Sequence, residues 1–127
     1  MNLRRTMLFI PGNNPGMLQN GGVFGADSVI LDLEDAVAPQ EKDAARFLVA
    51  QALKTVDYGT SEKVVRINPL DTFGAEDIQM MVPCQPDVLL VPKVESAQDI
   101  EGCQSAARSP AYYCGAGAHG HYSWGND

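Results

Sequence analysis

The chain has 127 residues, 45% of them hydrophobic, and a formal net charge of −7 at pH 7. That length suits one modest domain with a real core, which excludes a disordered chain, and the acidic balance argues against nucleic acid or an anionic membrane as partner. Three cysteines, with no signal peptide and no long apolar span, indicate a soluble protein of the reducing cytosol.

The first strand and helix signals lie in the first 25 residues. Residues 7–10 form an apolar run that predicts a strand ending at Pro11. Asn14 is a suitable helix N-cap, and Pro15 suits the first position of the helix that follows. The adjacent glycines at Gly21 weaken the last turn of this helix.

The second unit begins with residues 29–33, which predict a buried strand. Pro39 then begins a longer helix whose apolar residues recur at a spacing of three to four, as expected of a core-facing stripe. The stripe consists of Ala45, Val49, Ala52, Leu53 and Val56.

Two further units follow. Residues 64–68 predict the third strand, and residues 74–82 predict a short helix with acidic residues in its first turn. Residues 88–91 predict the fourth strand, and Ser96 begins another helix with a weak capping signal.

Four strand–helix units in a row, with apolar rather than alternating strands, predict a parallel sheet covered by helices. A complete (β/α)8 barrel needs about 250 residues, so this chain corresponds to the N-terminal half of a TIM barrel. A flavodoxin-like open sheet of similar length is the alternative fold.

Three carboxylates follow the second strand directly, namely Asp32, Glu34 and Asp35. The C-terminal ends of parallel strands are where such folds place their active sites. Carboxylates this close resist ionising together unless a cation compensates them. The segment therefore predicts a cationic partner, and Arg66, in the third strand, is the natural candidate.

Simpler structural roles compete with these assignments. We expect Asp32 to hydrogen-bond the following loop rather than to act in catalysis. Glu34 and Asp35 can be a solvated loop, but their place after a buried strand favours site residues. Arg66 can pair structurally with Glu34, whereas its sequence context favours a substrate role. Lys93 follows the fourth strand, which is weak support for a place in the site.

The composition changes after residue 101. From Glu101 to Asp127 the chain has no Val, Ile, Leu, Met or Phe. Such a segment suits neither a strand nor an aliphatic helix stripe, so we expect an irregular tail over residues 102–127. A disordered natural tail is usually more charged and less aromatic. We therefore favour a changed reading frame near residue 101.

A zinc site in this tail is a hypothesis that we reject. Its candidate ligands are Cys103, Cys114, His119 and His121. Their spacing matches no standard zinc module.

Five segments together resemble a known family. RRTMLFIPGNNPGML, GADSVILDLEDAV, EKDAAR, VVRINPLDT and VLLVPKVESAQDIE resemble the citrate lyase β subunit, within the HpcH/HpaI aldolase and malyl-CoA lyase superfamily. The resemblance covers residues 3–101, in order and at the family spacing, and we find none after residue 101. The LEDAV motif is shared across the superfamily, and its combination with NNPGML and RINPLDT indicates the citrate lyase branch.

The resemblance implies a carbon–carbon lyase domain at residues 1–101, which cleaves citryl-acyl-carrier-protein to acetyl-acyl-carrier-protein and oxaloacetate with Mg²⁺. It implies that Arg66 binds the substrate carboxylate and that Glu34 and Asp35 are the catalytic acids beside the metal. Arg4 and Arg5 can contact the phosphopantetheine arm of the carrier protein, but surface charge is the favoured explanation. The family's principal metal ligands lie on a fifth and a sixth strand, so no metal ligand is assigned to this sequence.

The resemblance also implies partners, namely the citrate lyase α subunit and the acyl carrier protein or γ subunit. Two alternatives stay open. One is a non-catalytic fragment of a disrupted gene, because the family's metal ligands are absent from the matching residues. The other is an acyl-CoA lyase of the malyl-CoA or citramalyl-CoA type from the same superfamily.

Overall fold

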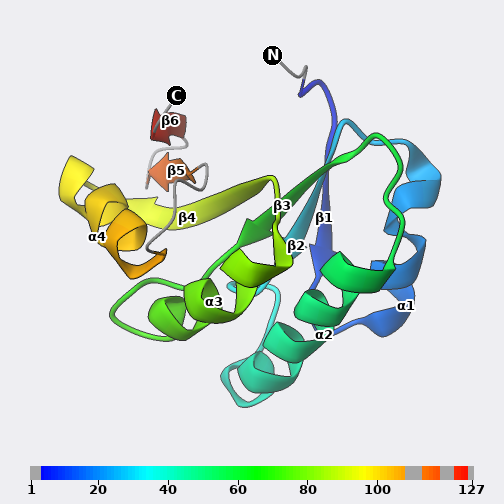
Figure 1. The fold of residues 1–127 in the computed structure, drawn as a ribbon, viewed down its shortest axis with the longest axis horizontal. Helices are drawn as coiled ribbons and strands as arrows, with labels where there is room; N and C mark the ends of the chain where they lie inside the picture. Colours follow the sequence, from blue (N-terminus) through cyan, green and yellow to red (C-terminus); the bar gives the residue numbers. More distant parts are fainter. Residues whose placement is uncertain (1–3, 108–112, 118–121, 126–127) are drawn as a thin grey trace.

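A computed structural model describes residues 4–107, 113–117 and 122–125, and these residues form one six-stranded sheet in the order β1-β2-β3-β4-β5-β6 (Figure 1). The strands are β1 (Met7–Pro11), β2 (Ser28–Asp32), β3 (Glu62–Arg66), β4 (Val88–Val94), β5 (Tyr113–Gly117) and β6 (Tyr122–Gly125). Strands β1 to β4 pair in parallel and in sequence order, which confirms the predicted α/β architecture.

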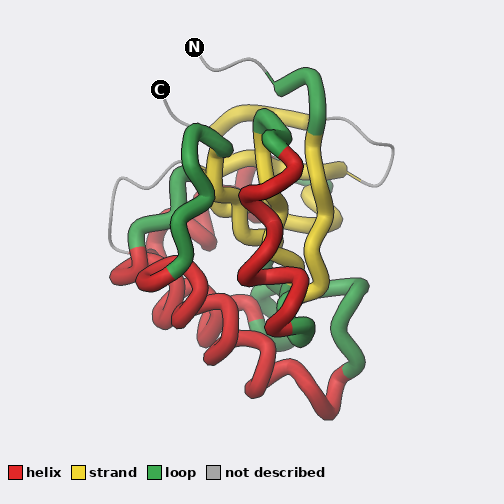
Figure 2. The backbone as a smooth tube through the Cα atoms, turned by 90° about the vertical axis from the view of Figure 1, so that its right-hand side faces the viewer, coloured by secondary structure: helices red, strands yellow, loops and turns green. Residues whose placement is uncertain are grey.

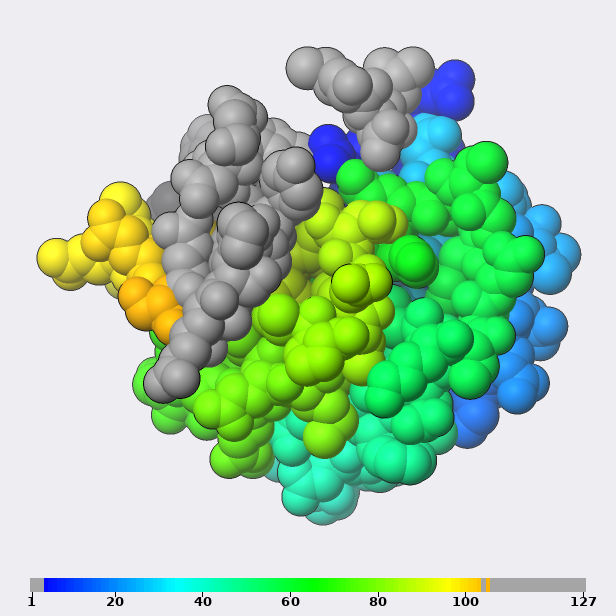
Figure 3. All heavy atoms as spheres, in the orientation of Figure 1, coloured from blue at the N-terminus to red at the C-terminus, as the bar shows by residue number. Residues whose placement is uncertain are grey.

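Helices follow the strands and gather on one side of the sheet (Figure 2). They are α1 (Pro15–Asn20), α2 (Lys42–Thr55), α3 (Gly74–Met81) and α4 (Ala97–Ala107), with 3-10 turns η1 (Gly21–Phe24), η2 (Pro39–Glu41) and η3 (Val82–Cys84). In the space-filling view of Figure 3, α2 in blue-green and α3 in yellow-green form one continuous surface. No helix among the described residues is long and apolar enough to cross a membrane.

The local signals account for most of the helix ends. Asn14 caps α1 as predicted, since its side-chain oxygen accepts a hydrogen bond from the Met17 amide at 3.1 Å. The helix changes to a 3-10 turn at Gly21, where the glycine pair weakens it. The helix predicted from Pro39 begins as the η2 turn and becomes α-helical at Lys42.

Strand β3 ends at Arg66 rather than at residue 68, and it begins two residues earlier than predicted. The reason lies at Asn68, whose backbone amide donates to Asp77 Oδ2 at 2.9 Å. Pro69 follows and has no amide hydrogen to continue a strand.

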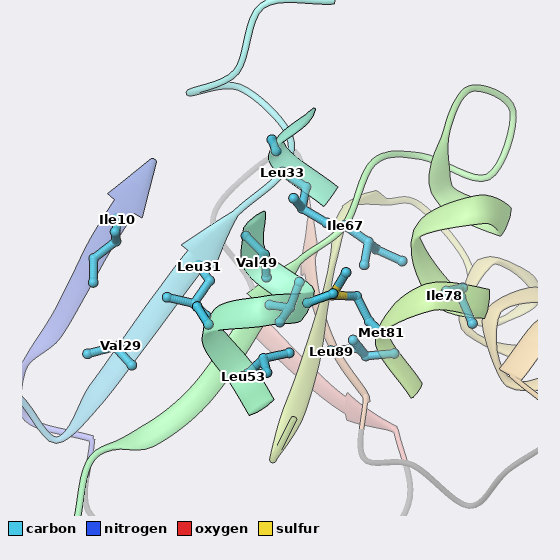
Figure 4. Packing of buried hydrophobic residues seen from close by; sticks show 14 of the residues in the cluster. Ile10, Val29, Leu31, Leu33, Val49, Leu53, Ile67, Ile78, Met81 and Leu89 are labelled. Carbon is cyan, nitrogen blue, oxygen red and sulfur yellow. The ribbon is translucent and has the colours of Figure 1, made fainter. Parts of the chain in front are cut away.

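The main core lies between the helices and one face of the sheet (Figure 4). The strands contribute Val29, Leu31, Val65 and Leu89, and the helices contribute Val49, Leu53, Ile78 and Met81. Alternate strand residues point to the other face, where Ile30, Val64, Val88 and Leu90 form a second buried cluster. By the same alternation, Asp32 and Arg66 lie on the face away from the helices.

The prediction of an irregular tail is wrong for two segments. Strand β5 continues the sheet in parallel beside β4, and β6 pairs with β5 in antiparallel orientation. The expected boundary between residues 101 and 102 also falls inside α4. Backbone pairing requires no large aliphatic side chains, because a strand at a sheet edge gains its hydrogen bonds from the main chain.

Candidate active site

The site begins where β2 and β3 end side by side. Asp32 and Arg66 are register partners on these strands. Arg66 Nε donates to Asp32 Oδ1 at 2.9 Å, and Arg66 Nη2 donates to Asp32 Oδ2 at 2.6 Å. The side chain of Asp32 is 1% exposed and that of Arg66 is 20% exposed. A two-bond pair of this kind holds a guanidinium in one orientation.

Asp32 also organises the turn that follows it. Its Oδ1 accepts from the amide of Glu34 at 2.9 Å, and its Oδ2 accepts from the amide of Ala36 at 3.2 Å. The expectation that Asp32 hydrogen-bonds the loop is confirmed. Its two-bond pairing with Arg66 is a finding of the structure. The sequence pattern favours Glu34 and Asp35 as the neighbours of Arg66.

Glu34 lies close to Arg66, with Glu34 Oε1 at 3.7 Å from Arg66 Nε. Burial raises the pKa of Glu34 to about 7, aided by the neighbouring Asp35 and opposed by Arg66 and Lys93. The hydrogen bond with Glu34 lowers the pKa of Asp35, which is exposed. The negative charge of the pair is therefore favoured on Asp35 and the proton on Glu34.

Two further side chains lie in the site, one beside Arg66 and one beside Glu34. The Phe9 ring lies under the Arg66 guanidinium, with Cζ at 5.1 Å from the ring centroid. Lys93 Nζ lies 3.9 Å from Glu34 Oε2, although the lysine is 68% exposed. The backbone of Lys93 is left-handed, with a φ of 54°, a strained conformation that is typical of functional sites. Sequence reasoning missed Phe9, since an apolar strand pattern does not reveal which residue neighbours Arg66.

Arg4 and Arg5 lie at the other end of the sheet. Arg4 binds the carboxylate of Glu62, with Nε–Oε1 and Nη2–Oε2 distances of 2.6 and 2.7 Å. Arg5 binds Asp27 at 3.1 Å. Both arginines precede β1, whereas Arg66 is at the end of β3. Arg5, with a side chain that is 73% exposed, fits the expected surface charge, whereas Arg4 is 25% exposed and pairs with the buried Glu62.

The zinc candidates divide between described and undescribed parts of the chain. The Cys103 side chain is buried, and burial raises the pKa of its thiol to about 11, which disfavours the thiolate that a metal needs. His119 and His121 lie outside the described residues, as does the Cys114 side chain. Among the described residues, no three His, Cys, Asp or Glu side chains are grouped to hold a metal.

Known proteins resemble this chain in sequence and in fold. Residues 5–121 match the family HpcH/HpaI aldolase/citrate lyase. The citrate lyase subunit beta of Leuconostoc mesenteroides subsp. cremoris is 62% identical over 96 residues, covering 75% of this chain and 32% of that protein. The Haemophilus influenzae citrate lyase subunit beta is 49% identical over 116 residues, covering 91% and 40%. A (3S)-malyl-CoA thioesterase of Cereibacter sphaeroides is 43% identical over 98 residues, covering 76% and 34%.

Solved structures agree. The citrate lyase beta subunit of Mycobacterium tuberculosis, complexed with oxaloacetate and magnesium, superposes with a TM-score of 0.70 at 31% identity, covering 91% of this chain and 49% of that one. RipC from Yersinia pestis superposes with a TM-score of 0.67 at 30% identity, covering 90% and 46%.

These matches confirm the family resemblance and correct its extent. The family match reaches residue 121, whereas the motifs alone indicate an end at residue 101. The chain spans about a third of the length of these curated relatives.

Proposed function

Because the chain belongs to the HpcH/HpaI aldolase/citrate lyase family, we propose that it performs carbon–carbon cleavage of the citrate lyase β type. The substrate is citryl-acyl-carrier-protein, and the products are acetyl-acyl-carrier-protein and oxaloacetate. The single observation that carries this proposal is the Arg66 guanidinium, held by Asp32 at the strand ends beside the acidic Glu34.

Arg66 is the proposed carboxylate binder. Its Nε and Nη2 edge is occupied by Asp32, and no hydrogen bond from Nη1 to a described residue is present. The end of the guanidinium formed by Nη1 and Nη2 is therefore the edge that meets a substrate carboxylate. Asp32 and the Phe9 ring hold the plane of the guanidinium, so little side-chain entropy is lost on binding.

Glu34 and Asp35 are the proposed catalytic acids. Cleavage breaks a carbon–carbon bond, transfers the C3 hydroxyl proton to a base and leaves the electron pair on the departing acetyl group as an enolate, which is then protonated. Glu34, with its pKa raised to about 7, is suited to accept and return a proton near neutral pH.

Magnesium is present in the solved structure of the Mycobacterium tuberculosis relative. Glu34 and Asp35 offer oxygen ligands of the type that Mg²⁺ prefers. The described residues bring no third metal-ligating carboxylate, histidine or cysteine to them. Glu34 and Asp35 alone do not complete the octahedral oxygen shell of Mg²⁺, so we propose Mg²⁺ for the family reaction with its other ligands from outside the described residues.

The family reaction also implies partners and a location. We propose an acyl carrier protein subunit and a citrate lyase α subunit as partners, and the cytoplasm as the location. The second candidate substrate is an acyl-CoA of the malyl or citramalyl type, because one relative is a (3S)-malyl-CoA thioesterase.

A graft tests the substrate class. The 96 aligned residues of this chain replace their counterparts in the Leuconostoc citrate lyase subunit beta, and oxaloacetate release is measured from citryl-acyl-carrier-protein. Malyl-CoA and citramalyl-CoA are assayed in parallel. We expect turnover of the citryl thioester, and preference for either CoA ester would contradict the proposed substrate.

A further inference from the structure

The turn that carries the two acids, residues 33–37 (the acidic turn), rests on a buried ammonium group. Lys42 opens α2 and is 9% exposed. Its Nζ donates to the backbone carbonyl of Leu33 at 2.9 Å and to that of Glu34 at 2.6 Å. A buried lysine is costly unless its charge is well solvated, so these two carbonyls act in place of water.

A second donor reaches the same carbonyl from the segment after β3. Asn68 Nδ2 donates to the Leu33 carbonyl at 2.9 Å and to Asp77 Oδ2 at 2.7 Å. Asp77 Oδ1 in turn accepts from Arg46 Nε at 2.8 Å. The carbonyls of the acidic turn are thus joined to α2 through Lys42 and to α3 through Asn68.

Asp32 holds the acidic turn through two of its backbone amides. Its two oxygens accept the amides of Glu34 and Ala36, and the turn closes with the Val37 amide on the Glu34 carbonyl at 3.2 Å. The Glu34 carbonyl therefore accepts from both Lys42 and Val37. One buried cation and one buried anion therefore hold the same short backbone segment, the cation at its carbonyls and the anion at its amides.

We propose that Lys42 is a positioning residue for the Glu34–Asp35 pair, acting through the backbone of the acidic turn. The proposal rests on the proposed function only in taking this pair as the reacting acids. Without the ammonium, the two carbonyls lose a charged donor, and the turn loses the contact that sets where Glu34 lies relative to Arg66.

Hydrogen exchange on the 127-residue chain tests this. We expect Lys42→Met, which keeps a long side chain but no charge, to reduce protection of the amides of Glu34, Ala36 and Val37 by about tenfold. Protection of Leu31 and Val65 in the sheet should stay unchanged. Lys42→Arg should restore most of the loss, because arginine keeps the charge and the donors. Lys54→Met, at the exposed end of the same helix, is the matched control.

The comparison of Lys42→Met with Lys42→Arg separates positioning from packing, because arginine restores the charged donors to the two carbonyls without restoring the shape of lysine. Undiminished protection in Lys42→Met, equal loss across the sheet, or no restoration by Lys42→Arg would each overturn the proposal. None of these readouts involves substrate, so a failed lyase assay leaves their outcome unaffected.

Discussion

Asp32 and Arg66 stand opposite each other on neighbouring parallel strands and are joined by two hydrogen bonds of 2.9 and 2.6 Å. The Asp32 side chain is almost fully buried, while the Arg66 side chain is 20% exposed. Asp32 is therefore the residue that orients Arg66, and it also holds the amides of the acidic turn. One side chain links the proposed carboxylate binder to the proposed acids.

Asp32→Asn should lower both stability and oxaloacetate binding. An asparagine amide presents hydrogens where Arg66 and the turn amides need an acceptor, which leaves a buried donor unpaired. We expect a loss of about 1–3 kcal/mol in the free energy of unfolding, measured in urea. Asp27→Asn changes the half-buried partner of Arg5, at the opposite end of the sheet, and is the control. Equal effects of the two substitutions would contradict the special role of Asp32.

Arg66→Lys should weaken oxaloacetate binding by at least about tenfold in isothermal titration calorimetry. Lysine keeps the charge but offers no planar edge for Asp32 and the substrate at the same time. Arg5→Lys, at the opposite end of the sheet, should leave the affinity unchanged. If Arg66→Lys binds oxaloacetate as tightly as the parent chain, the carboxylate-binding role of Arg66 is wrong.

Glu34 should make the chain less stable as the pH rises from 4.5 to about 7. The native state keeps a proton on Glu34 up to about pH 7, whereas the unfolded state releases it near the ordinary pKa of 4.5. The contribution is complete below that window and is lost above it. It is on the order of 1 kcal/mol, because Asp35 shares the charge and solvent screens it. Urea unfolding across this pH range measures the slope.

The comparison variants for this pH effect are Glu34→Gln and Glu95→Gln. Glu34→Gln should flatten the slope, because the amide does not titrate. Glu95→Gln alters an exposed glutamate and should retain the slope. If Glu34→Gln shows the same slope of unfolding free energy against pH as the parent chain, the group that titrates is not Glu34.

A polypeptide of residues 1–127 alone should release no oxaloacetate from citryl-acyl-carrier-protein with Mg²⁺. Its described residues bring two carboxylates but no complete metal site together. The Leuconostoc graft provides the positive control in the same assay. Turnover by the 127-residue polypeptide comparable to that of the graft would show that Arg66, Glu34 and Asp35 suffice.

The DNA sequence of the gene tests the hypothesis that the reading frame changes near residue 101. Translation of the sequence downstream of the codon for Glu101 in the other two frames should yield segments rich in Val, Ile and Leu, as a barrel requires. Two observations argue against the hypothesis, namely the family match to residue 121 and the presence of strands β5 and β6. If neither alternative frame encodes such segments, the hypothesis is wrong.

Local sequence sufficed for the order and type of the elements from β1 to α4. Short runs rich in apolar residues predicted strands β1 to β4, although β4 continues through Pro92 to Val94, and the Asn14–Pro15 pair predicted the start of α1. These features depend on backbone restrictions and side-chain periodicity within a few residues, so they can be identified without knowledge of the fold.

The composition, motifs and spacing of the sequence determined the α/β class, the family and the position of Glu34, Asp35 and Arg66 at the strand ends. Only the tertiary structure decided that Asp32 takes the guanidinium of Arg66, 34 residues away, and that Lys42 is buried under the acidic turn. Such partners depend on strand register and on how a helix lies against the sheet. A shift of one residue in the register of β3 would move Arg66 to the other face and away from Asp32, and the residues of one strand do not name their partners on its neighbour.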